Sequence, residues 1–206
     1  MPSHREIPAP LPLKVAFIGT HGVGKTTLCY ELAAKLKKRH LDADIVTEVA
    51  RSCPLPINQT TNAGAQRWIL HTQIAQEIEL EARARVVVCD RSVLDNYAYH
   101  VASAGRDVRV EQVVRGWLPT YGLLLRVPPR GRISRDGVRD TDPHFQVRID
   151  QVIGGLLKEW RIEVVDLGPL SRPRWIGAAQ AAVLAWIRGE ELPQAGEAPE
   201  PQMDLF

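Results

Sequence analysis

Short apolar runs alternate along the chain with longer segments in which hydrophobic residues recur every three or four positions. The apolar runs have the length and composition of β-strands, and they fall at residues 14–18, 44–49, 86–89, 123–127 and 162–165. The periodic segments are predicted helices, at residues 27–40, 63–85, 92–103, 108–118, 143–160 and 175–188. Strands that alternate with helices in this way predict an α/β fold, with a five-stranded parallel sheet covered by helices on both faces.

The same pattern predicts which positions are buried. In the first helix Leu28, Leu32 and Leu36 recur every four residues, which places them on one buried face. In the long second helix the residues expected on a buried stripe are Leu70, Ile74, Ile78 and Ala82. The run at 86–89 contains no polar residue, as expected of a parallel strand that is buried on both faces.

Residues 19–26 join the first strand to the first helix and read Gly-Thr-His-Gly-Val-Gly-Lys-Thr, a complete phosphate-binding P-loop. Glycines let the chain curl round a phosphate so that successive N–H groups point at it, and the helix adds its positive N-terminus. Lys25 is expected to reach the outer phosphates, and the Thr26 hydroxyl to hold Mg²⁺. The predicted ATP-binding residues are Gly19, His21, Gly22, Val23, Gly24, Lys25, Thr26 and Thr27.

Two carboxylate–arginine pairs follow the second and third predicted strands, Glu48 with Arg51 and Asp90 with Arg91. Ligands of parallel α/β sheets bind beyond the carboxyl ends of the strands, so both pairs are expected beside the P-loop. Phosphoryl transfer needs a carboxylate that orients the acceptor hydroxyl and an acid that holds Mg²⁺ through water. Glu48 is the candidate for the first role and Asp90 for the second, with the exchanged assignment left open. The alternative is that both are ordinary surface ion pairs.

These segments together resemble the nucleoside and nucleotide kinase branch of the P-loop proteins over roughly residues 14–188. Residues 47–51 are similar to the Glu-x-x-Ala-Arg-type segment of deoxynucleoside kinases, and Asp90-Arg91 is similar to the Asp-Arg of thymidylate kinases. The resemblance implies that Glu48 is the catalytic base and that Gln73 pairs with the edge of the acceptor base. For Gln73, an ordinary solvated glutamine is the alternative. The predicted substrate-binding residues are Glu48, Arg51, Gln73 and Arg91.

An arginine-rich loop is predicted at residues 128–142. It occupies the position of a kinase lid, and its segment 136–140 resembles the lid of ribosylnicotinamide-kinase-like domains. Guanidinium groups of a lid close over the transferring phosphate and expel water. Arg135 and Arg139 are therefore predicted catalytic residues, together with Lys25 and Arg91; the alternative is a solvated run of arginines.

The last five residues are similar to the sliding-clamp-binding box of bacterial replication and repair proteins. The predicted partner-binding residues are Gln202, Met203, Leu205 and Phe206. Residues 189–201 are rich in Glu, Pro, Ala and Gly, which is typical of a flexible tether. The alternatives are that the tail folds back on its own domain or that the string matches by chance.

Composition narrows the remaining classes. The chain has 206 residues, a net charge of +2 and a hydrophobic fraction of 45%, which fits one globular domain at 14–188 after a lead-in at 1–13. The weak charge counts against an extended nucleic-acid surface. Three cysteines without a Cys-x-x-Cys pair argue against a zinc site or a disulfide framework and favour a cytoplasmic protein. No run is long enough for a membrane span, and the proline-rich start is not that of a signal peptide.

The sequence thus predicts an ATP- and Mg²⁺-dependent kinase that acts on a nucleoside, a nucleotide or a nucleoside-like small molecule. The alternative is a P-loop ATPase or a polynucleotide 5′-kinase that serves DNA replication or repair and is recruited to the sliding clamp by its tail. The acceptor, the choice between ATP and GTP, and the oligomeric state are left open.

Overall fold

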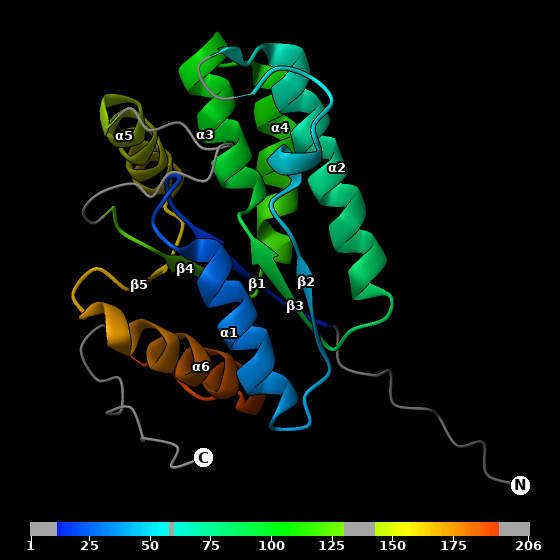
Figure 1. Ribbon diagram of the computed structural model, residues 1–206, viewed down its shortest axis with the longest axis vertical. Coiled ribbons are helices and arrows are strands. Elements are labelled where there is room, and N and C mark those ends of the chain that lie inside the picture. Colours follow the sequence, from blue (N-terminus) through cyan, green and yellow to red (C-terminus); the bar gives the residue numbers. More distant parts are fainter. Residues whose placement is uncertain (1–11, 58–59, 130–142, 194–206) are drawn as a thin grey trace, which may run out of the picture.

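The computed structural model describes residues 12–57, 60–129 and 143–193. Its centre is a sheet of five parallel strands in the order β2-β3-β1-β4-β5 (Figure 1). The strands are β1 (Leu13–Ile18), β2 (Ala43–Val46), β3 (Val86–Asp90), β4 (Leu123–Arg126) and β5 (Val165–Asp166). The predicted α/β class with a five-stranded parallel sheet is confirmed.

Helices cover both faces of this sheet, as predicted. The α-helices are α1 (Lys25–Lys37), α2 (Ala63–Glu81), α3 (Val93–Ala104), α4 (Val108–Trp117), α5 (Pro143–Trp160) and α6 (Arg172–Arg188). Two short 3₁₀ turns, η1 (Val49–Ser52) and η3 (Leu118–Thr120), follow β2 and α4. Figure 1 shows α1 and α6 together on one side of the sheet and the other four α-helices on the opposite side.

The central strand β1 divides the hydrophobic core in two because its side chains alternate between the faces of the sheet. Val15 and Phe17 pack on the α1 and α6 side, whereas Ala16 and Ile18 pack on the α2, α3 and α5 side. Every residue of β1, including Lys14, is buried. Its carboxyl end delivers the chain directly into residues 19–26.

The fifth strand is shorter and lies later than predicted. Residue Ile162, expected at its start, instead closes the C-terminal turn of α5: its N–H bonds to Leu157 O at 3.0 Å, and Arg161 adopts a left-handed conformation with φ 52°. This is the Schellman arrangement, which satisfies the last carbonyls of a helix. Only Val165–Asp166 then pairs with β4.

The buried face of α2 also differs from the predicted apolar stripe. Ile78 is 52% exposed, while the polar residues Gln73 and Glu77 are buried. The reason is Lys14, which belongs to β1 and is fully buried under α2. Its ammonium requires buried carboxylates, so the helix turns its acidic side towards the sheet.

We call this group the Lys14 cluster, and its members are Lys14, Gln73, Glu77, Glu81, Trp117 and Tyr121. Lys14 Nζ lies 2.9 Å from a carboxylate oxygen of Glu77 and 2.9 Å from one of Glu81. Glu77 also accepts hydrogen bonds from Gln73 Nε2, Trp117 Nε1 and Tyr121 OH at 2.8, 2.7 and 2.6 Å. The cluster therefore ties β1 to α2, to the C-terminal end of α4 and to the segment that follows α4.

Several predicted segments lie outside the described residues. They are the lead-in at 1–11, the arginine loop from 130 to 142 with Arg135 and Arg139, and the C-terminal string with Gln202, Met203, Leu205 and Phe206. Among the helices that the structure describes, none has the length and hydrophobicity that crossing a membrane requires.

Candidate functional site

Residues 19–26 form a tight loop between β1 and α1. Gly19, Gly22 and Gly24 have positive φ angles of 141°, 75° and 96°, a conformation that favours glycine. A Cβ on Gly19 would collide with the backbone carbonyl oxygen of Val127. Gly24 is the N-cap of α1 and offers no side chain to its first amides, so these amides remain available to an anion.

Asp95 of α3 holds the start of the loop in place. Its Oδ1 accepts the N–H of Gly19 at 2.8 Å, and its Oδ2 accepts both the N–H and the hydroxyl of Ser92 at 2.9 Å. Ser92 and Asp95 form the capping box of α3. The Ser-x-x-Asp spacing in the sequence could have identified this box, but not its contact with Gly19.

Lys25 lies across the loop with its ammonium buried. Nζ donates hydrogen bonds to Gly19 O at 2.8 Å and Thr20 O at 2.7 Å. Burial, assisted by the nearby Arg91 guanidinium, lowers the pKa of Lys25 to about 8. The amino group thus lies against the backbone of the loop, and at neutral pH only a small free energy favours its charged form.

Nucleotide binding is therefore expected to take up a proton through Lys25. At a pKa of about 8 the free side chain is mostly neutral at pH 8.5, and a neighbouring triphosphate favours the ammonium form. Binding should take up roughly 0.7 proton at pH 8.5 and roughly 0.1 at pH 7. The affinity should consequently fall as the pH rises above about 8. Calorimetric titration with Mg-ATP, in two buffers of different ionisation enthalpy, measures this uptake.

The matched variants are Lys25→Met, which removes the titrating group, and Lys37→Ala, which removes an exposed lysine of the same helix. Lys25→Met should take up no extra proton at the higher pH, whereas Lys37→Ala should behave as wild type. An uptake that is equal at the two pH values in the wild-type protein would contradict the assignment.

Thr26 and Asp90 form a pair of oxygen ligands at the base of the loop. The Thr26 hydroxyl donates to Asp90 Oδ2 at 2.5 Å. Burial raises the pKa of Asp90, against the opposing influence of Lys25 and of the Thr26 hydrogen bond. A hydroxyl beside a carboxylate is a donor set of hard oxygens, which suits Mg²⁺. These residues could hold the ion that P-loop domains typically bind with the nucleotide.

Glu48 lies between two arginines. Its Oε1 accepts from Arg91 Nε and Nη2 at 3.0 and 2.6 Å, and its Oε2 accepts from Arg51 Nε at 3.0 Å. Although burial opposes ionisation, the arginines and Lys25 lower the pKa of Glu48 to about 2. Among the described residues, no ion pair joins Asp90 to Arg91. Arg91 pairs instead with Glu48, the carboxylate that follows β2.

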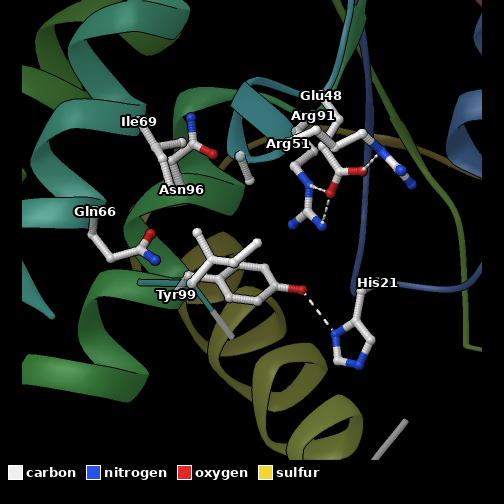
Figure 2. Close-up of a pocket in the computed structure, with 10 residues that line it drawn as sticks. His21, Glu48, Arg51, Gln66, Ile69, Arg91, Asn96 and Tyr99 are labelled. Atoms are coloured by element: carbon white, nitrogen blue, oxygen red, sulfur yellow. Dashed lines mark hydrogen bonds and ion pairs between the residues drawn. The ribbon is translucent and has the colours of Figure 1, made fainter. Parts of the chain in front are cut away.

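A pocket opens beside these groups (Figure 2). Its wall comes from the P-loop, η1, α2 and α3, and the lining residues are His21, Glu48, Ala50, Arg51, Ile57, Gln66, Ile69, Arg91, Asn96 and Tyr99. The structure thus brings together Glu48, Arg51 and Arg91. It does not bring in Gln73, which donates to Glu77 at 2.8 Å within the Lys14 cluster.

His21 is the P-loop side chain that lines this pocket. Its Nδ1 lies 2.9 Å from the hydroxyl of Tyr99, and Gln146 Nε2 donates to its backbone oxygen at 2.8 Å. The Arg91 guanidinium lies over the Tyr99 ring, with Arg91 Cζ 4.7 Å from the ring centroid. These contacts connect the phosphate loop to the Glu48–Arg91 pair across the floor of the pocket.

Some residues of the site were missed from the sequence. Gln66 lies on α2 seven residues before Gln73, which is two helical turns and the same face. Asn96 and Tyr99 follow the recognised Asp90-Arg91 pair on α3, but their spacing carries no motif. Arg172 begins α6. Its Nη2 would lie 3.1 Å from a Cβ on Gly24, which adds positive charge beside the loop.

The fold and the loop together define a P-loop nucleotide-binding domain. Residues 14–172 match the family described as "AAA domain", and the chain belongs to this family. No curated protein matches the sequence. Among solved structures, the thymidylate kinase from Ehrlichia chaffeensis is similar with a TM-score of 0.59 and 16% identity, covering 77% of this chain and 94% of that chain. At this identity the likeness concerns the fold alone.

Proposed function

We propose that the protein is an ATP- and Mg²⁺-dependent phosphotransferase whose acceptor is a nucleoside, a nucleotide or a nucleoside-like small molecule. The observation that supports this most is the pocket beside the P-loop, which is lined by Glu48, Arg51 and Arg91. A simple ATPase needs only a water molecule at this point, so a pocket lined by convergent charged side chains favours a second substrate.

On the donor side, the open amides of α1 and the Lys25 ammonium bind and neutralise the phosphates. Thr26 and Asp90 would hold Mg²⁺ beside the outer phosphates, where the ion would supply positive charge. Arg172 adds a cation beside Gly24. Lys25 leaves the carbonyls of Gly19 and Thr20 when it moves to a phosphate oxygen, which requires no change in the fold.

On the acceptor side, Glu48 orients the acceptor hydroxyl towards the terminal phosphate. With a pKa of about 2, this carboxylate is ionised at every physiological pH but is a weak base. Phosphoryl transfer passes through a loose transition state in which positioning contributes more than early proton removal. We therefore assign Glu48 mainly the hydrogen bond that aligns the hydroxyl, and Arg91 the task of keeping the carboxylate in place.

Glu48→Gln is expected to lower kcat by about 10²–10³-fold, with little change in ATP affinity. The neutral amide is a poorer hydrogen-bond acceptor than the carboxylate for the acceptor hydroxyl, and it weakens both arginine contacts. The assay is ADP release in the presence of nucleosides, nucleoside monophosphates and short 5′-hydroxyl oligonucleotides. Because the pKa of Glu48 is about 2, Glu48 stays ionised between pH 4 and 5. The profile of wild-type kcat against pH should therefore show no step there from Glu48, and Glu48→Gln should not change the shape of the profile in this range.

The matched control is Glu79→Gln, which changes an exposed carboxylate of α2 and should leave kcat unchanged. ADP release that is the same with and without every acceptor would contradict the phosphotransferase and favour the ATPase. Full activity of Glu48→Gln with the true acceptor would contradict the role of Glu48.

A further inference from the structure

Asn96 carries a buried hydrogen-bond donor that the described part of the chain does not satisfy. The residue lies in the first turn of α3 and is only 3% exposed. Its Nδ2 is buried and has no hydrogen-bond partner among the described residues. Buried side-chain N–H groups are nearly always paired, and an unpaired one is costly. A ligand that supplies an acceptor atom at this point would remove the cost.

Asn96 belongs to the wall of the pocket, where a second amide accompanies it. Gln66 of α2 is 5% exposed and lines the same pocket. Its Nε2 donates to Thr61 Oγ1 at 2.8 Å, which fixes the orientation of the amide. The Oε1 oxygen of Gln66 receives no hydrogen bond from the residues that the structure describes. The pocket therefore offers one N–H donor and one carbonyl acceptor from two neighbouring helices.

The other lining residues suit a flat ring that bears a polar edge. Ile57, Ile69 and the Tyr99 ring give apolar walls, while the charged groups gather at the end near the P-loop. Figure 2 shows Gln66, Ile69 and Asn96 on the side of the pocket away from His21. A ligand with a hydroxyl at the P-loop end would thus place its ring against the two amides.

We propose that Asn96 determines the acceptor specificity by donating Nδ2–H to a carbonyl oxygen on the acceptor ring, while Gln66 Oε1 accepts from the adjacent ring N–H. This inference rests on the proposed function and narrows its acceptor to nucleosides or nucleotides with a –C(=O)–NH– edge. Uracil, thymine, hypoxanthine and guanine have this edge. Cytosine and adenine have an amine where the carbonyl is, and that amine would place a donor against a donor.

The test compares acceptors that differ only at this edge of the ring: uridine with cytidine, thymidine with 5-methyldeoxycytidine, and inosine with adenosine. Each pair is assayed both as the nucleoside and as the 5′-monophosphate. The carbonyl member of the preferred pair should have a kcat/KM about 10–100-fold higher. Asn96→Leu should raise the KM for that acceptor and reduce the preference, leaving only the part that Gln66 contributes. Asn96→Asp, which can only accept, should shift the preference towards the amine member.

The controls separate this inference from the proposed function. Gln151→Leu, an exposed amide of α5, should change neither KM nor preference. ADP affinity, measured by calorimetry, shows whether each Asn96 variant is folded, and Asn96→Ser serves if Asp or Leu is not tolerated. Acceptor-dependent ADP release with equal use of both members of every pair, or with a preference that Asn96 variants leave intact, would overturn the inference and leave the phosphotransferase standing. The absence of any acceptor would instead overturn the proposed function.

Discussion

Lys25→Ala is expected to abolish phosphoryl transfer and leave the fold intact. The ammonium lies at the mouth of the P-loop, where its only described contacts are the carbonyls of Gly19 and Thr20. Removal deletes the charge that follows the transferred phosphoryl group, and loss of such preorganised charge costs about 10²–10³-fold in rate or more. ADP release with the true acceptor is the measurement, together with thermal unfolding of both proteins.

The stability of this variant follows from the direction of the pKa shift. Burial lowers the pKa of Lys25 from 10.5 to about 8, so the unfolded chain binds the proton more tightly than the folded protein does. The charged lysine therefore destabilises the fold at pH values below about 8, and this cost declines as the pH rises towards 10.5. Lys25→Ala should be no less stable than wild type at pH 7. Turnover near the wild-type rate in a folded Lys25→Ala protein would refute the kinase assignment altogether, and Lys37→Ala is the matched control.

Glu77→Ala is expected to lower the free energy of unfolding by about 3–5 kcal/mol. Glu77 and Lys14 are both fully buried, and Glu77 accepts from Trp117, Tyr121 and Gln73 as well. Its removal leaves the Lys14 ammonium with Glu81 as its only carboxylate partner. It also deprives the buried donors of Gln73 and Tyr121 and the half-buried donor of Trp117 of this acceptor. Urea unfolding followed by circular dichroism measures the loss.

Two further variants show whether the charge is the cause. Glu79→Ala, on the exposed face of the same helix, should change stability by less than about 0.5 kcal/mol. The double variant Lys14→Met/Glu77→Met removes both charges and should be more stable than Glu77→Ala, because no fully buried ion remains. If Glu77→Ala is as stable as wild type, the Lys14 cluster does not hold α2 to the sheet.

The phosphate loop was predictable because its residues are contiguous in the sequence. The glycine positions of residues 19–26, the lysine and threonine that follow, and the strand before them lie within a short stretch of chain. Each has a backbone reason, such as the positive φ angles of Gly22 and Gly24. Alternating runs also predicted the α/β class, since a strand without polar residues has to be buried on both faces.

Pairing between side chains of distant segments could not be predicted in the same way. The sequence offered Asp90 as the neighbour of Arg91, yet Arg91 bonds to Glu48, forty-three positions earlier, and Asp90 bonds to Thr26. Adjacent residues after a strand point in different directions, so sequence proximity does not decide their partners. Arg91 also has a φ of 93°, a backbone conformation that no local pattern indicated.

The amino-acid sequence by itself determined the phosphate loop, the parallel sheet and the end of the sheet at which ligands bind. Only the tertiary structure decided which face of α2 meets the pocket. Lys14, which stands in an otherwise apolar strand, draws Glu77 inward and places Gln73 beside it. With α2 turned in this way, Gln66 faces the pocket, where Asn96 of α3 also lies. Helical periodicity fixes which residues share a face, but the partner of that face depends on burial of a charge contributed by another element.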